Sequence, residues 1–234
     1  MTRRLLLLPL LLVACGDAAA TDTPDAPPPD GPSGGGDKPP SAWHSRQSGT
    51  TGNLLGVAFG NEFVAVGSGG VVLTSPDGTT WQVGSNGTGD DLLGVTYANL
   101  NLLKYIAVGP GVVFTSTAGT SWHEETLTGT GPDTFQAVVQ AHPSIIGVGT
   151  GGALVTSPDG SSWTLRSAGA NAVLLGAANG PSADVAFVAV GETASGVIYS
   201  TTDPTTGTAF TPRATSLPFL HAVAATLSVL LVPN

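Results

Sequence analysis

The chain has 234 residues, with 33 glycines, 18 prolines and only 10% charged residues. An average soluble domain has about a quarter of its residues charged, so this composition excludes coiled coils and helical bundles and favours β-strands joined by tight turns. Seven Lys and Arg against 16 Asp and Glu give a formal net charge of −9. A negative chain does not neutralise phosphates, and we therefore expect no nucleic-acid partner.

Residues 1–14 have the features of an export signal. A positive start is followed by an apolar run of nine residues, Leu5 to Val13, and by Ala14 directly before the only cysteine. The run is too short to cross a bilayer, which takes about 20 apolar residues. The segment Leu12-Val13-Ala14-Cys15 resembles the lipobox of bacterial lipoprotein signal peptides.

This resemblance implies that Cys15 carries lipid, palmitate included, and anchors an exported protein to the membrane of the cell envelope. Gly16 is not the aspartate that retains such lipoproteins at the inner membrane of enteric bacteria, so the outer membrane is favoured. Two alternatives stay open: an ordinary signal peptide with a stray cysteine, and twin-arginine export through Arg3-Arg4. With a single cysteine, no intramolecular disulfide can form.

Residues 15–42 are predicted to be the acylated cysteine followed by a disordered tether. Residues 16 to 40 contain seven Pro, five Gly and five Asp, and no aromatic residue. Such a segment cannot bury enough apolar surface to offset the loss of chain entropy. We expect it to act as a spacer between the membrane and the next domain.

Residues 43–234 form a repeat. An apolar motif recurs at successive offsets of 38, 43, 39 and 46 residues. Its copies are Leu54-Leu55-Gly56-Val57, Leu92-Leu93-Gly94-Val95, Phe135-Gln136-Ala137-Val138, Leu174-Leu175-Gly176-Ala177 and Leu220-His221-Ala222-Val223. Each of the first four copies is followed by a second and a third apolar run, and then by a turn and a fourth strand. Four short strands per unit predict an all-β fold, a β-propeller of four-stranded blades.

Second strands are predicted at residues 63–67, 105–109, 145–149 and 187–191, and third strands at 71–75, 112–116, 153–157 and 196–200. Fourth strands are predicted to begin at the aromatic residues Trp81, Trp122, Trp163 and Phe210. Trp43 precedes Leu54 by eleven residues, as Trp81 precedes Leu92, so the domain is predicted to begin with a fourth strand. Residues 220–224 and 228–232 would be the first two strands of the closing blade. We expect five blades with an incomplete closing blade; a truncated gene is the alternative.

The turn before each fourth strand carries the most specific motif. It reads Ser75-Pro76-Asp77-Gly78-Thr79-Thr80-Trp81 and Ser157-Pro158-Asp159-Gly160-Ser161-Ser162-Trp163, with an eroded copy from Ser116 to Trp122. These motifs resemble the Asp-box, or BNR, repeat of sialidase-type propellers, shortened by one residue between Asp and Trp. The resemblance covers residues 43 to about 213 and implies a propeller fold.

The motif has a structural explanation without any ligand. Proline presets φ, aspartate accepts hydrogen bonds from the turn amides and glycine closes the turn, while the tryptophan is expected to pack between blades. Ala118 replaces the aspartate in one copy, and a catalytic role for the carboxylate would not allow this replacement. We therefore assign structural roles to Ser75, Asp77, Trp81, Ser116, Trp122, Ser157, Asp159 and Trp163.

Enzymatic activity is the first alternative, because Asp-box propellers include sialidases and other glycoside hydrolases. Sialidases bind a carboxylate with three arginines, and the chain has Arg46, Arg166 and Arg213 after its export signal. Each lies three residues after the repeat aromatic, so all three occupy one peripheral position on different blades and cannot converge. We expect no catalytic residue, no cofactor and no metal site. A propeller assembly factor is the second alternative, because the photosystem II assembly-factor family also uses Asp-box propellers.

A binding face is predicted at the loops that join the fourth strand to the next blade and the second strand to the third. These loops carry Asn86, Asp90, Asp91, Asp133 and Glu192. The face is acidic and short of aromatic residues, which favours a protein partner, or a cation at Asp90 and Asp91, over a sugar. A solvated acidic rim is the structural alternative. The sequence thus predicts a lipid-anchored propeller that acts as a non-catalytic binding or scaffold module.

Overall fold

The computed structural model describes residues 44–87, 89–99, 103–131, 133–141, 144–168, 171–182, 185–193, 196–203 and 211–214. These residues form β-strands and two short 3-10 turns, with no α-helix among them. No helix in the described ranges has the length and hydropathy needed to span a bilayer. Cys15, the predicted tether, Trp43, Phe210 and the two predicted strands within 220–232 lie outside the described residues.

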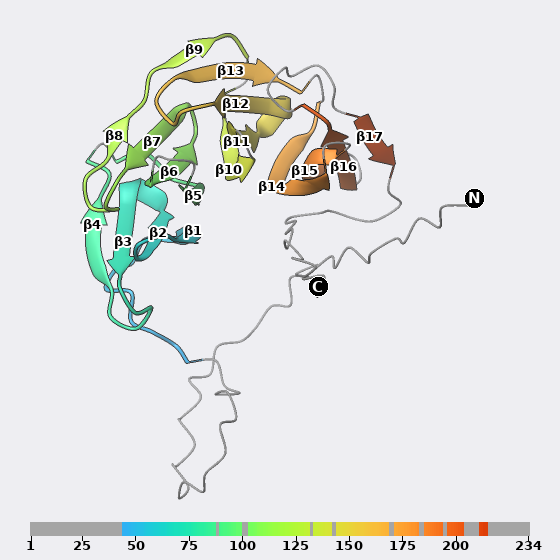
Figure 1. The fold of residues 1–234 in the computed structure, drawn as a ribbon. Coiled ribbons are helices and arrows are strands. Elements are labelled where there is room, and N and C mark those ends of the chain that lie inside the picture. The colour runs from blue at the N-terminus through green and yellow to red at the C-terminus, as the bar shows by residue number, and fades with distance from the viewer. Residues whose placement is uncertain are drawn as a thin grey trace, which may run out of the picture.

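Four sheets are arranged along an arc around a common centre, with their innermost strands nearest that centre (Figure 1). We call them blades 1 to 4 in chain order. Blade 1 contains β1 (Leu54–Phe59), β2 (Phe63–Gly67), β3 (Val71–Ser75) and β4 (Gln82–Ser85), and blade 2 contains β5 (Gly94–Ala98), β6 (Lys104–Gly109), β7 (Val112–Ser116) and β8 (His123–Glu124). Blade 3 contains β9 (Leu127–Gly129), β10 (Phe135–Ala141), β11 (Ser144–Gly149), β12 (Ala153–Ser157) and β13 (Trp163–Ser167). Blade 4 contains β14 (Val173–Ser182), β15 (Val185–Glu192), β16 (Gly196–Thr201) and β17 (Thr211–Ala214).

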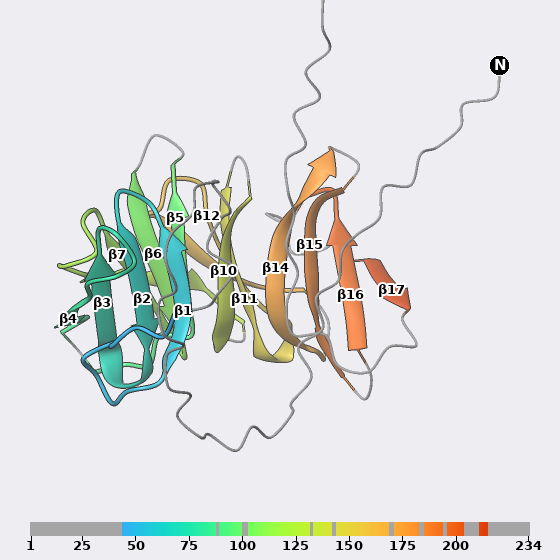
Figure 2. The same ribbon diagram turned by 90° about the horizontal axis from the view of Figure 1, so that it is seen from below.

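The sheets confirm the prediction of an all-β propeller with four-stranded blades. The four predicted strands of each blade form an antiparallel meander, and the blades stand side by side when the ring is viewed from its edge (Figure 2). The second and third strands match their predicted positions most closely: β2, β3, β7 and β12 have the predicted bounds. The prediction that the domain begins with a fourth strand from Trp43 is wrong for the described residues, because residues 44–53 form no strand. The other predicted strands of the fifth blade lie outside the described ranges.

Both faces of the middle strands are buried, which explains their continuous apolar runs. In β2, Val64 and Val66 are fully buried in a cluster between blades 1 and 2, while Ala65 points to the other side of the sheet. Similar clusters lie between blades 2 and 3 and between blades 3 and 4. Each blade is therefore stabilised mainly by its neighbours.

A glycine lies at the end of the second strand in blades 1 to 3, and one residue before the end in blade 4, because the chain passes very close to it. A Cβ atom added at this position would overlap the carbonyl group of the residue that leads into the inner strand of the same blade. The pairs are Gly67 with Asn53, Gly109 with Asp91, Gly149 with Thr134 and Gly191 with Val173. The requirement is one of space and not of φ, since φ at Gly67 is −169° and at Gly149 is −174°, which is extended backbone.

Inner strands of neighbouring blades also approach closely, at the third position of the repeated motif. A Cβ atom added to Gly56 would lie 3.2 Å from the Val95 nitrogen, and one added to Gly94 would lie 3.0 Å from the Ala137 Cα. In blades 1 and 2, the glycine at the third motif position thus meets the inner strand of the next blade.

Strand β9 is an element that the sequence did not predict. It follows the two-residue β8 and pairs in parallel with β13, with Leu127 opposite Trp163. Its Thr128 hydroxyl donates a hydrogen bond to the Trp163 carbonyl at 2.8 Å. The connection from blade 2 to blade 3 therefore adds a fifth strand to the outer edge of blade 3 (Figure 1).

Candidate functional site

The turns before the fourth strands, which we call the outer turns, are residues 75–81, 116–122 and 157–163. In the first, the Asp77 carboxylate accepts hydrogen bonds from the amides of Thr79 and Thr80 at 2.8 and 2.9 Å, and the Ser75 hydroxyl accepts one from Gly78 at 2.9 Å. Gly78 has a φ of +69°, in the left-handed region. The two hydrogen bonds from these backbone amides hold the pKa of Asp77 below its ordinary value.

The third outer turn repeats these contacts. Asp159 accepts hydrogen bonds from the amides of Ser161 and Ser162 at 2.8 and 2.7 Å, and also from the Ser162 hydroxyl at 3.0 Å. The hydrogen bonds from the backbone amides, chiefly the one from Ser162, lower the pKa of Asp159 to about 2. Both carboxylates are therefore committed to their own turns.

The second outer turn keeps its shape without the carboxylate. The Ser116 hydroxyl still accepts a hydrogen bond from Gly119 at 2.8 Å, and the Trp122 indole donates one to the Gly119 carbonyl at 2.9 Å. Because Ala118 has no acceptor, the amides of Thr120 and Ser121 lack the two bonds that the other turns make. The turn thus tolerates loss of the aspartate.

Loops at the opposite end of the strands carry the predicted acidic face, which we call the connector face. Asp91 accepts a hydrogen bond from the Gly69 amide at 2.6 Å, which ties the β4–β5 connector to the β2–β3 turn. Asn86 is only 5% exposed and bridges its own connector: it accepts from the Gly89 amide at 3.1 Å and donates to the Asp90 carbonyl at 3.2 Å. Asn86 and Asp91 therefore hold the loop in one conformation.

The remaining acidic residues of this face come from other blades. Asp133 is exposed, and its carbonyl accepts a hydrogen bond from the Gly111 amide of blade 2 at 2.8 Å. Glu192 is half-buried at the end of β15, opposite Gly196. The structure thus places the predicted residues on one face of the arc, at the same end of the strands, on or beside loops joined by hydrogen bonds. Across the described residues, no group of three or more His, Cys, Asp or Glu side chains could hold a metal ion.

Two of the three arginines considered for a sialidase site can be located on strands. Arg166 lies opposite Leu154 in blade 3, and Arg213 lies opposite Ile198 in blade 4. These are the same positions of the outer strands β13 and β17, at the periphery of the arc. Arg46 precedes β1 and belongs to no strand.

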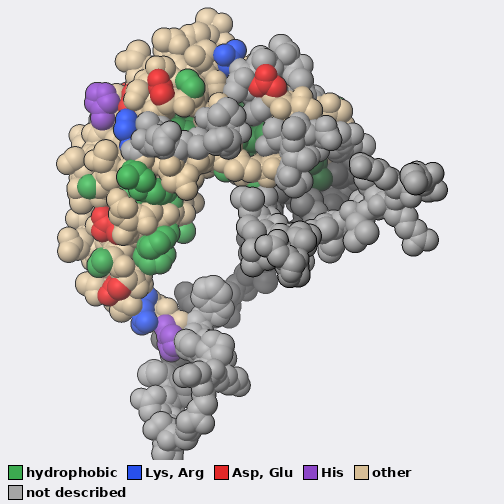
Figure 3. All heavy atoms as spheres, viewed as in Figure 1, with side chains coloured by type: hydrophobic (Ala, Val, Ile, Leu, Met, Phe, Trp, Pro, Cys, Tyr) green, Lys and Arg blue, Asp and Glu red, His purple; other side chains and the backbone are tan. Residues whose placement is uncertain are grey.

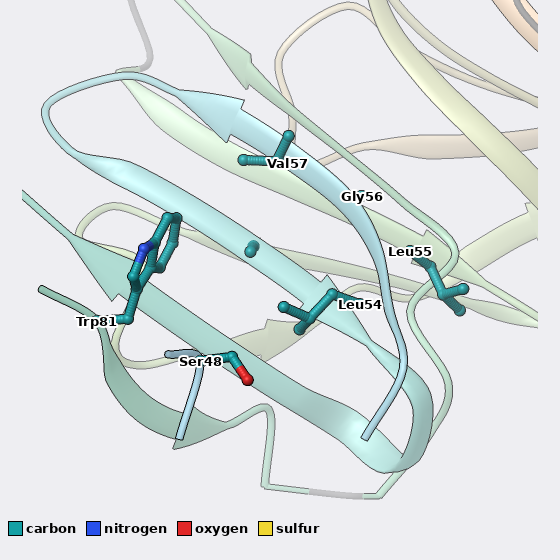
Figure 4. A pocket seen from close by; sticks show the side chains of 7 residues that line it. Ser48, Leu54, Leu55, Gly56, Val57 and Trp81 are labelled. Carbon is teal, nitrogen blue, oxygen red and sulfur yellow. The ribbon is translucent and has the colours of Figure 1, made fainter. Parts of the chain in front are cut away.

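An apolar surface on blade 1 is a feature that the sequence analysis missed. On the side that points away from blade 2, Leu54, Val57 and Phe59 are 42%, 63% and 60% exposed. A hollow of about 380 Å³ opens there, and Figure 4 shows side chains that line it on β1 and at Trp81, just before β4. It is lined by Ser48, Leu54, Leu55, Gly56, Val57, Ala65 and Trp81.

We call this surface the open face. It includes an aromatic contact between Phe59 and Phe63, whose ring centroids are 4.6 Å apart, and Trp81 lies 6.3 Å from Phe63. Figure 3 shows hydrophobic side chains at the molecular surface over this inner part of blade 1. The sequence predicted the strands correctly but could not show that this side of the first blade lacks a neighbour among the described residues.

A second hollow, of about 400 Å³, lies beside the second outer turn and is polar. Two of its lining groups are already engaged: Glu125 accepts a hydrogen bond from the Thr115 hydroxyl at 2.6 Å, and the Lys104 amine donates one to the Ser161 hydroxyl at 3.3 Å. The Lys104–Ser161 contact joins blade 2 to the third outer turn.

Comparison with known proteins supports the fold. No protein-family profile and no curated protein matches the chain. The solved structure of YCF48 bound to D1 peptide is similar, with a TM-score of 0.58 and 22% identity over 76% of this chain and 59% of that chain.

Two weaker similarities are to the WD40 β-propeller domain of Doa1 and to an ancestral GH74 enzyme. Their TM-scores are 0.49 and 0.47, with 16% and 17% identity. The first comparison covers 64% of this chain and 52% of that one, and the second covers 63% and 24%. The four described sheets and the similarity to the YCF48 structure define the fold class, a β-propeller, and the chain spans only 59% of the YCF48 structure.

Proposed function

We propose that this protein is a lipid-anchored β-propeller of the cell envelope that binds a protein partner without catalysing a reaction. The observation that carries the proposal is the connector face, where acidic side chains from successive blades stand on hydrogen-bonded loops. Function is commonly placed on loops that a rigid scaffold positions, because a preorganised surface loses little conformational entropy on binding. The bound peptide in the similar YCF48 structure supports a protein partner.

Charge defines the kind of partner. The connector face carries Asp90, Asp91, Asp133 and Glu192, and the whole chain has a net charge of −9. The one lysine of the described residues, Lys104, contacts Ser161 of the third outer turn, at the other end of the strands. A partner with a basic surface would be steered to the connector face, and the association would weaken as salt increases.

The binding test compares two charge reversals on the full chain. Asp133→Lys changes the connector face, whereas Glu124→Lys makes the same change on the exposed outer strand β8. Proteins of the envelope are captured on each variant and identified by mass spectrometry. We expect Asp133→Lys to reduce retention of a saturable partner and Glu124→Lys to leave it unchanged. Equal retention by both variants, or no saturable partner, would refute the proposed face.

The anchor has its own test, because its failure is independent of the binding face. We propose that Cys15 is acylated and that the outer membrane holds the protein, as the lipobox resemblance implies. Wild-type protein should incorporate labelled palmitate and sediment with outer-membrane fractions, and Cys15→Ser should do neither. Unlabelled wild-type protein would refute acylation of Cys15 and favour an export signal without a lipid anchor.

Turnover of a panel of chromogenic glycosides tests the absence of catalysis. A glycoside hydrolase needs two carboxyl groups placed across the scissile bond. The outer-turn carboxylates Asp77 and Asp159 instead bind the amides of their own turns. Hydrolysis of any of these glycosides by the wild-type chain would refute the proposal of a non-catalytic binding module and favour a glycoside hydrolase.

A further inference from the structure

The open face of blade 1 has the same composition as surfaces that a neighbouring blade covers elsewhere in the molecule. Leu54, Val57 and Phe59 occupy the repeat positions of Leu92, Val95 and Tyr97 in blade 2. Those blade 2 residues pack against Val64, Val66 and Val72 of blade 1. The open face therefore has the pattern of a surface built to be covered by one more blade.

The sequence after the last described strand contains a segment of the right kind. Seven positions separate the end of β13, Ser167, from Leu174, the first motif residue of blade 4, and six separate the end of β17, Ala214, from Leu220. Leu220 begins the fifth copy of the inner-strand motif. The connection from blade 4 to the next motif copy is thus only one residue shorter than the connection from blade 3.

The third motif position identifies the contact. It holds a small residue in all five copies: Gly56, Gly94, Ala137, Gly176 and Ala222. In blades 1 and 2 this residue faces the backbone of the next inner strand, at the distances of 3.2 and 3.0 Å given above. By the same relation, Ala222 would face the backbone of Gly56 and Val57 in β1.

We infer that the open face of blade 1 is the seat of residues 220–232 of the same chain, with the strand from Leu220 beside β1. Ala224 then faces Val57. The equivalent residues in blades 3 and 4, Val139 and Ala177, pack against one buried cluster. This inference is independent of the proposed function, since it concerns how the ring closes and not what the connector face binds.

Covering the open face is also favourable energetically. Leu54, Val57 and Phe59 are between 42% and 63% exposed. Removing these apolar side chains from water stabilises the folded protein. A contiguous apolar surface of this kind is uncommon on a monomer and marks an interaction site. Residues 220–232 are themselves apolar apart from His221, Thr226 and Ser228, and carry no Asp, Glu, Lys or Arg.

Cysteine cross-linking tests the inference on the full chain. The only native cysteine is replaced in a Cys15→Ser background, and Val57→Cys and Ala224→Cys are added together. A short bis-maleimide should join residues 57 and 224 within one molecule, as intact mass and peptide mapping would show. The control pair, Thr79→Cys with Ala224→Cys, should remain unlinked because Thr79 lies on an outer turn.

Three outcomes would overturn the inference. A link between two molecules would assign the open face to a second copy, and a link to another protein in cells would assign it to that partner. Two singly modified cysteines in a folded monomer would show that the segment does not reach β1.

Proteolysis supplies a second measurement that does not depend on cross-linking geometry. Val57 is 63% exposed in the described structure, so an aspartate there meets water unless the segment covers it. We expect an endoprotease of broad specificity to cut within residues 220–232 about tenfold faster in Val57→Asp than in wild type, because a covered, unpaired charge disfavours docking. Thr79→Asp should not change the rate. Equal rates of proteolysis for all three proteins would refute the inference that residues 220–232 cover the open face.

Discussion

Trp122 in blade 2 and Trp163 in blade 3 occupy the same repeat position, yet their surroundings differ. Trp122 is half-buried, and its indole nitrogen donates to the Gly119 carbonyl of its own turn. Trp163 is 1% exposed, and its indole nitrogen is buried without a hydrogen-bond partner. Only Trp163 has β9 alongside, with Leu127 opposite it and packed against the same cluster. The motif determines where the tryptophan lies, and the neighbouring strand determines how deeply it is buried.

The largest expected effect is the loss of Trp163. Trp163→Ala should destabilise the domain by about 3 to 5 kcal/mol, as large-to-small substitutions of buried aromatic residues do. Trp122→Ala should cost about 1 to 2 kcal/mol, because less of that side chain leaves water on folding. Urea unfolding followed by circular dichroism measures both. Equal losses would contradict the role given to β9.

Glycine substitutions compare a close backbone approach with an open position. Gly149→Ala should cost about 1 to 3 kcal/mol, because the added methyl group would overlap the Thr134 carbonyl and force the backbone to move. Gly84→Ala is the matched control, since its nearest atom, the Val72 carbonyl oxygen, would lie 3.6 Å away. The control should change stability by no more than about 0.5 kcal/mol. A tolerated Gly149→Ala would mean that the recurring glycine has another cause.

The outer turns allow a comparison in the stabilising direction. Ala118→Asp should restore the two hydrogen bonds that Asp77 and Asp159 make, to the amides of Thr120 and Ser121. We expect a gain of about 0.5 to 1.5 kcal/mol, the usual net contribution of such bonds. Ala118→Asn separates the effect of the charge from that of the side chain's shape. A destabilised Ala118→Asp protein would show that the second turn has lost the conformation of the other two.

Local patterns in the sequence predicted more of this fold than of its surfaces. The strands β2, β3, β7 and β12 have the predicted bounds because a continuous apolar run and a following turn are features of neighbouring residues. Strand β9 could not be found in this way, since its three residues have no apolar period and pair with a strand 36 positions later at Trp163↔Leu127.

The predicted site shows the same division. The acidic residues of the connector face follow from loop position alone, because antiparallel strands return alternate loops to one end of the ring. Which of them hold the loops could not be read from the sequence: the buried Asn86 amide and the Asp91–Gly69 bond depend on contacts across a turn. The open face was missed because Leu54 and Leu92 hold the same position of the same sequence motif. Leu54 is 42% exposed and Leu92 is fully buried, and the difference is that Leu92 has a neighbouring blade.

The smallest expected effect is on the pH dependence of stability. The turn amides lower the pKa of Asp159 from 3.8 to about 2 in the folded protein. A lowered pKa means that the carboxylate stabilises the fold above pH 3.8, and that this contribution is lost as the pH falls towards 2. Asp159→Asn should therefore lose less stability than wild type across that window, and Ala118→Asp should lose more than wild type. Urea midpoints measured from pH 5 to pH 2 compare the three proteins. If the urea midpoints of all three proteins changed equally with pH, the hydrogen bonds from the turn amides would not distinguish the charged carboxylate from the neutral acid.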